Sequence, residues 1–86
     1  MNSALQGELN RLAGITNPLN FLAEQGAANV WAGTTNLSLV DALHVKAGIT
    51  DLTAYMDVQG VCNVLAGVTD IKDWTGAADA LSKVVS

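Results

Sequence analysis

Apolar and polar positions recur along the chain in one short phrase. Residues 7–14, 26–33 and 60–67 share an initial Gly, a central Asn and a final Ala-Gly pair. Residues 41–48 keep the Ala-Gly ending, whereas residues 76–81 keep only the start. Self-similar units of this kind usually bury their apolar faces by stacking on one another. The pattern therefore predicts tandem structural repeats.

The repeats are unevenly spaced. The Ala-Gly pairs end at Gly14, Gly33, Gly48 and Gly67, which are 19, 15 and 19 residues apart. Two consecutive units therefore define a period of 34 residues. Because four residues make about one helical turn, we expect the four additional residues to lengthen the helix in alternate units. Long and short helices are predicted to alternate.

Each repeat boundary contains residues that end one helix and begin another. A Gly after the last apolar residue can adopt the left-handed conformation that ends a helix, and Asn or Asp side chains can accept the free N–H groups of the next helix. The predicted caps are Gly14, Gly33, Gly48 and Gly67 at helix ends and Asn17, Asn36, Asp51 and Asp70 at helix starts. Pro18 follows Asn17, at the first helical position, where proline is favoured.

These signals predict five helices, over residues 3–13, 18–32, 37–47, 52–66 and 71–84. Joints of three or four residues require consecutive helices to fold back closely on one another. We therefore expect a single compact all-α domain over residues 1–86, as either an open solenoid or a closed bundle.

Small and polar residues also recur within the predicted helices. Gly26, Gly60 and Gly76 indicate either close helix packing or a kink that shapes a binding surface. Asn29 and Asn63 each follow a Gln by four residues, so that each pair shares one helical face. These pairs are interpreted as structural ties or, as the alternative, as ligand contacts.

The charge pattern argues against several classes of partner. The chain has 86 residues, of which half are hydrophobic and 14% charged, and a formal net charge of −4. The four basic residues are widely spread, whereas phosphate binding needs them clustered. Every apolar run is too short to span a membrane, and the first seven residues lack the pattern of a secretion signal. We expect no nucleic-acid or membrane partner, and synthesis in the cytoplasm.

Candidate chemistry is sparse. His44, the single histidine, occupies the place of Asn in other units, and Cys62, the single cysteine, replaces Ala28 in the matching unit. A catalytic nucleophile needs a neighbouring base, but packing within the repeat accounts for both residues. The carboxylates lack the spacing of a calcium loop. We expect no enzyme, no metal site and no cofactor.

The units that depart from the pattern contain the candidate interface residues Lys46, Lys72 and Trp74. Lys46 takes a place that is apolar elsewhere, and Lys72 and Trp74 precede the last phrase. Terminal repeats are often atypical, so these departures fit the edges of a stack. The alternative is that Trp74 anchors a partner, because Trp is enriched at interface centres.

Residues 12–17, 26–37 and 60–67 resemble the LAGTTGL-type helical repeats of virion structural proteins from tailed phages that infect actinobacteria. The resemblance spans residues 7 to 81, and the Ala-Gly-x-Thr core is its specific part. It implies a virion protein made in the host cytoplasm that binds shell or tail proteins and, as a further option, itself.

Within that class, a capsid accessory or decoration protein that binds through an apolar helical face is the first expectation. A minor tail or fibre component is the second. The competing class is a helical regulator, outside the virion, that binds a host protein. Self-assembly into a helical array is the third possibility.

Overall fold

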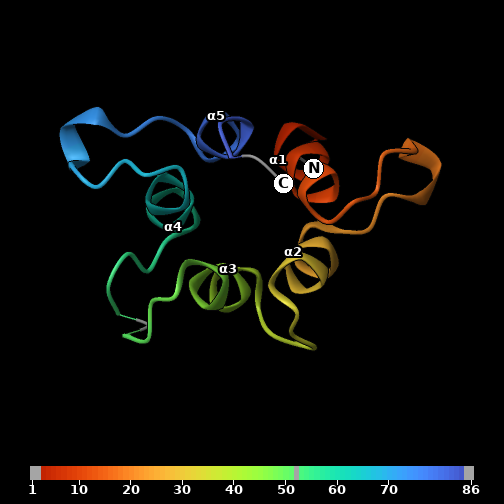
Figure 1. Cartoon of the computed structure of the whole chain (residues 1–86), viewed down its shortest axis with the longest axis horizontal. Coiled ribbons are helices and arrows are strands. Elements are labelled where there is room, and N and C mark those ends of the chain that lie inside the picture. The colour runs from red at the N-terminus through yellow and green to blue at the C-terminus, as the bar shows by residue number, and fades with distance from the viewer. Residues whose placement is uncertain (1–2, 52, 85–86) are drawn as a thin grey trace.

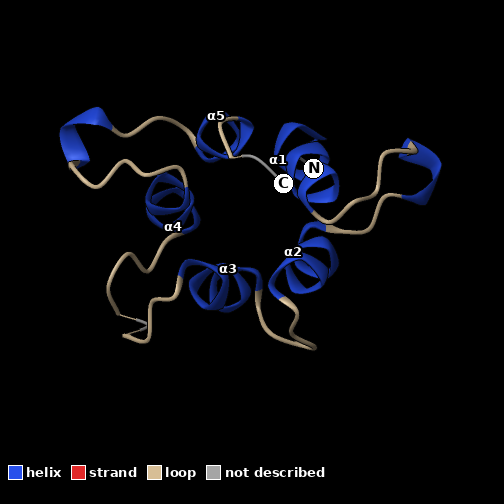
Figure 2. Ribbon diagram, in the orientation of Figure 1, coloured by secondary structure: helices blue, strands red, loops and turns tan. Residues whose placement is uncertain are grey.

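The computed structural model describes residues 3–51 and 53–84. It contains the α-helices α1 (Ser3–Leu12), α2 (Glu24–Ala32), α3 (Leu39–Ala47), α4 (Val58–Leu65) and α5 (Ala77–Ser82), with short 3-10 helices η1 (Pro18–Asn20) and η2 (Ile71–Asp73). The described residues contain no strand (Figure 2). The predicted all-α class is confirmed, and the molecule is a single compact globule of 36 × 24 × 23 Å.

The five α-helices are arranged as a closed ring (Figure 1). Each helix packs against the helix before and after it, and α1 also packs against α5. The seam between α1 and α5 includes Arg11, whose guanidinium donates hydrogen bonds to the carbonyl oxygens of Leu81 at 3.0 Å and Val84 at 3.1 Å. Of the two arrangements left open by the sequence, the structure adopts the closed one.

In α2 to α5 the buried apolar side chains come from two adjacent positions of each helix, whereas α1 contributes Leu5, Leu9 and Leu12. Among the buried residues of the second position, large and small side chains alternate around most of the ring: Leu9, Ala28, Leu43, Cys62 and Leu81. Interiors pack at crystal-like density, and a small residue between two leucines allows neighbouring helices to approach. The Ala-rich composition therefore serves close packing.

The helix ends follow the predicted glycine chemistry. Gly33 and Gly48 cap α2 and α3 with φ of 73°. Gly14 and Gly67 have φ of 87° and 86° just beyond the ends of α1 and α4. Positive φ is accessible to glycine without steric cost, so the chain turns out of each helix from α1 to α4 at the same place in the phrase.

The predicted helix starts are partly wrong. Asn17 and Asp70 cap the short helices η1 and η2, and Pro18 begins η1. Asn36 has φ of 63° and caps no helix. The side chain that caps α3 is Ser38, and Asp57 caps α4. Asp51 accepts hydrogen bonds from the backbone and hydroxyl of Thr53 in a local turn.

The predicted alternation of long and short helices is also wrong. The helices α2, α3 and α4 have 9, 9 and 8 residues. The additional four residues of the longer units lie in the loops, where a 3-10 turn or an irregular turn precedes the α-helix. Gly76, expected inside a helix, is instead the N-cap of α5. The predicted start of the fourth helix at residue 52 lies outside the described residues.

Candidate protein-binding surfaces

Buried amide side chains fix the loops to the ring. The side-chain nitrogen of Asn63 donates to the carbonyl oxygens of Gln59 and Thr75, and its oxygen accepts from the Thr75 N–H. Asn10 makes the equivalent bonds with Gln6 and Leu22. One amide thus pairs with both polar groups of one loop residue. These contacts support the interpretation of the recurring Asn as a structural tie.

Asn29 makes the same arrangement in the second unit, with Gln25 and Leu37 as partners. Its side-chain oxygen also accepts from the Thr34 hydroxyl at 2.7 Å. The Gln25 side chain adds a second donation to the Leu37 carbonyl at 2.8 Å. The α2–α3 loop is therefore held at both its start and its end.

His44 replaces this amide in α3. Its Nδ1 lies 2.8 Å from the carbonyl oxygen of Val40, and its Nε2 lies 2.8 Å from that of Ala54. The ring is fully buried. Because a neutral imidazole has one N–H, it can donate to one of these carbonyls, whereas only the imidazolium can donate to both. His44 is thus the polar variant of the repeat that the sequence predicts.

Two loops project from opposite ends of the ring, and the short helices η1 and η2 lie at their tips (Figure 1). Leu19 in η1 is 91% exposed and Ile71 in η2 is 71% exposed. Met56, in the α3–α4 loop, is 67% exposed. The largest exposed apolar side chains are therefore on loops, and the expected apolar helical face is limited to exposed valines of α2 and α3, Val30 and Val45.

Trp74 is tucked against the ring rather than projecting from it. A Cβ atom added to Gly60 would lie 3.0 Å from Cη2 of Trp74, and the ring centroids of Trp74 and Tyr55 are 6.2 Å apart. The Trp74 Nε1 is buried with no hydrogen-bond partner in the described part of the chain. Tyr55, Met56, Ile71 and Trp74 line a hollow of about 460 Å³. Trp74 therefore anchors its own loop to α4.

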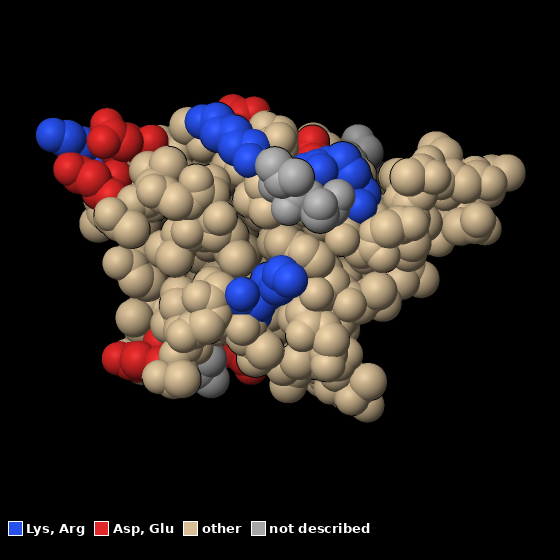
Figure 3. Space-filling view, viewed as in Figure 1, with Lys and Arg blue, Asp and Glu red and all other residues tan. Residues whose placement is uncertain are grey.

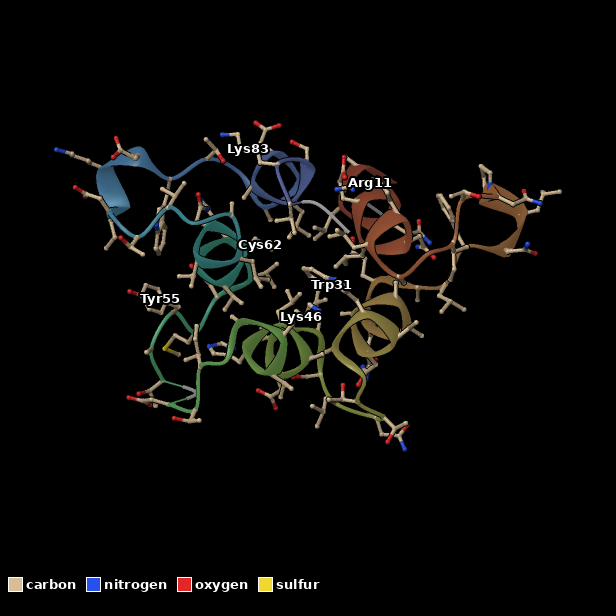
Figure 4. The ribbon with its side chains drawn as sticks, in the orientation of Figure 1. Arg11, Trp31, Lys46, Tyr55, Cys62 and Lys83 are labelled. Atoms are coloured by element: carbon tan, nitrogen blue, oxygen red, sulfur yellow. The ribbon has the colours of Figure 1, made fainter. Side chains whose placement is uncertain are left out.

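Basic side chains gather on one face of the ring. Arg11, Lys46 and Lys83, labelled in Figure 4, come from the C-terminal ends of α1, α3 and α5 and lie on the near face in Figure 3. The Lys46 ammonium lies 5.2 Å from the ring centroid of Trp31. Cations near helix C-termini complement the helix dipoles. Lys46 thus has a role in the ring as well as an exposed charge.

The three predicted interface residues do not form one site. Lys46 lies beside Trp31 on α2, whereas Lys72 is exposed in η2, with its ammonium 3.7 Å from the Asp70 carboxylate. Trp74 follows η2 and contacts the ring beside Gly60. Leu19 was not among the predicted interface residues, because residues 18–32 were predicted to form one helix. The signal for its exposure was its position next to Pro18, which begins the short helix η1.

The titratable groups show local effects. Burial raises the pKa of the Cys62 thiol to about 12, which keeps it neutral and unreactive. The Thr53 hydroxyl, and next its N–H, lower the pKa of the exposed Asp51. No three His, Cys, Asp or Glu residues within 3–51 and 53–84 are grouped to hold a metal ion. No helix in these ranges is long and apolar enough to cross a membrane.

No family model, curated protein or solved structure matches the chain. The fold and its surfaces define an all-α ring with apolar loop tips.

Proposed function

We propose that this chain is a phage virion structural protein, specifically a capsid accessory or decoration protein that binds other virion proteins. The observation that carries the proposal is the pair of projecting loops with exposed Leu19 and Ile71. Burial of a large apolar side chain of this kind against a partner contributes about 1.5–3 kcal/mol to binding. The repeat phrase supplies the virion assignment through its resemblance to phage structural repeats.

The remaining surface fits a permanent assembly. Residues 12–23 and 25–40 contain no charged residue, and charged residues are depleted from the centres of interfaces. The ring is fixed by buried amides and by Arg11, so that the loops are held in place before binding. A rigid binding element loses less conformational entropy when it associates.

The assignment is tested by quantitative mass spectrometry of particles purified from the lysate in which the chain is made. We expect one copy per shell subunit or a simple fraction of that number. A few copies per particle would favour a minor tail or fibre component instead. Absence from the particles would favour a regulator that binds a host protein and would refute the virion assignment.

The loop surface is tested by co-sedimentation of the purified chain with particles that lack it. Leu19→Asp places a charge at an exposed tip and should reduce the bound fraction severalfold. Asn20→Asp is the matched control, because it adds the same charge to the next exposed residue of η1. Equal binding of Leu19→Asp and the unmodified chain would remove η1 from the interface.

A further inference from the structure

A hollow of about 450 Å³, whose lining contains no charged side chain, lies beside Gly26. Its lining includes Leu22, Gln25 and Val30, with Thr34, Thr35 and Asn36 of the α2–α3 loop. Leu22 is 37% exposed and Val30 is 53% exposed. In Figure 3 the end of the molecule that carries η1, on the right, shows only tan atoms on its visible face. The volume is in the range of sites that bind small ligands or single side chains.

Comparison of the loops within the chain shows what this hollow lacks. Three loops span nine residues from the left-handed glycine to the next N-cap, and each has an aromatic residue two positions before that cap: Phe21, Tyr55 and Trp74. The α2–α3 loop spans only five residues, from Gly33 to Ser38. It has Asn36 at the corresponding position. The shortest loop is therefore the one without an aromatic side chain.

On α4 the aromatic residue of the following loop covers the helix, whereas on α1 it does not, because a Cβ added to Gly7 would meet nothing within 4 Å. Gly26 and Gly60 occupy the same place in the phrase, three residues after the N-cap. The indole of Trp74 covers Gly60, with Cη2 3.0 Å from an added Cβ. At Gly26 an added Cβ would meet only the side chain of Leu22, at 3.5 Å. The same helical surface is thus covered by an indole in one unit and open in the other.

We propose that the hollow beside Gly26 binds an aromatic side chain from an uncharged segment of a partner protein. The indole over Gly60 is the internal example of the group that fits this helical surface. No charged side chain lines the hollow, which selects against a charged segment, because its desolvation would be uncompensated. Thr34, Thr35 and Asn36 supply polar groups at the edge of the hollow, as at the rim of an interface.

This inference rests on the proposed function as a protein-binding component, but its test needs no particle. The purified chain is titrated with N-acetyl-tryptophanamide and observed through its backbone amide resonances by NMR. We expect saturable shifts that centre on Gly26, Val30 and Thr35. N-acetyl-alaninamide, which lacks the ring, should produce shifts at least about tenfold weaker at equal concentration.

Gly26→Met fills the hollow and should weaken the apparent affinity for N-acetyl-tryptophanamide at least about tenfold. The variant should fold, because replacing a mid-helix glycine favours the helix. Gly7→Met is the matched control. It changes the same phrase position in α1, where an added Cβ meets nothing within 4 Å, and should leave the titration unchanged.

Four results would overturn the proposal. The first is the absence of saturable shifts, and the second is a titration that Gly26→Met leaves intact. The third is a set of shifts centred on Tyr55 and Met56, which would place the aromatic group in the other hollow. Shifts at Gly26 on simple dilution of the chain would identify a second copy as the occupant and would also overturn the assignment to a partner protein. If the hollow beside Gly26 does not bind the aromatic group, the proposed virion function is still tested separately by mass spectrometry of the particles.

Discussion

Replacement of Asn63 by Ala tests whether the buried amides hold the loops. The side chain is fully buried. It donates to the Gln59 and Thr75 carbonyls, both at 2.9 Å, and accepts from the Thr75 N–H at 3.0 Å. A net contribution of about 1 kcal/mol for each of the three bonds gives an expected loss of about 3 kcal/mol in the free energy of unfolding. Small domains have only about 5–15 kcal/mol in total.

The loss is measured by urea unfolding with linear extrapolation, followed through tryptophan fluorescence, because Trp74 adjoins the loop residue that is released. Asn63→Asp has nearly the same shape but loses both donations and introduces a buried charge, so it should be at least as destabilising. Asn20→Ala is the control at an exposed position in η1 and should change stability by less than about 0.5 kcal/mol. A loss below about 1 kcal/mol for Asn63→Ala would refute the reasoning.

Three further changes test the ring, the core and the helix ends. Arg11→Met removes the hydrogen bonds to the end of α5 while keeping the aliphatic stem, and should lower the free energy of unfolding by about 2 kcal/mol. Amide hydrogen exchange should accelerate more in α5 than in α3. Uniform acceleration would contradict a stabilising role of Arg11 at the seam between α1 and α5. Cys62 has a folded pKa of about 12 against an ordinary value of 9.0, so that its thiol ionises first in the unfolded chain. Between pH 8 and 10 the free energy of unfolding, measured relative to that of Cys62→Ala by thermal or urea unfolding, should therefore fall by about 1.4 kcal/mol. A rise in this free energy over the same pH range would contradict the burial of the thiol. Gly33→Ala should lower the free energy of unfolding in urea by about 1 kcal/mol, because φ is 73° and no neighbour obstructs the added Cβ. Gly26→Ala, within a helix, should instead raise it. Equal effects of the two substitutions would refute the left-handed cap.

The helix ends were predictable because they depend on nearby residues. The Ala-Gly pair places an achiral residue where the chain must leave the helix, and the left-handed φ of Gly33 and Gly48 follows. Helix starts were harder to predict. Asn17 accepts the N–H of Leu19 as an N-cap side chain would, but the turn that it begins ends after three residues. The side chain identifies a start and carries no information on length.

The ring and the candidate site depend on contacts that are distant in sequence. Arg11 reaches Leu81 across the seam, and no local pattern predicts which carbonyls a guanidinium will meet. The uneven spacing of the Ala-Gly pairs was visible in the sequence, but it could lie in either the helices or the loops. The structure places it in the loops, and the shorter α2–α3 loop is the one without an aromatic residue two positions before the N-cap.

Because α1 packs against α5, every helix of the ring already has two neighbours. An open stack of repeats can grow by adding units at its ends, but a closed ring has no free end to which a unit could be added. A duplicated unit would have to widen the circumference and repack the alternating leucines rather than extend a rod. Larger assemblies must therefore be built from whole rings that touch through their loops and faces, with the number of helices in each ring fixed by its closure.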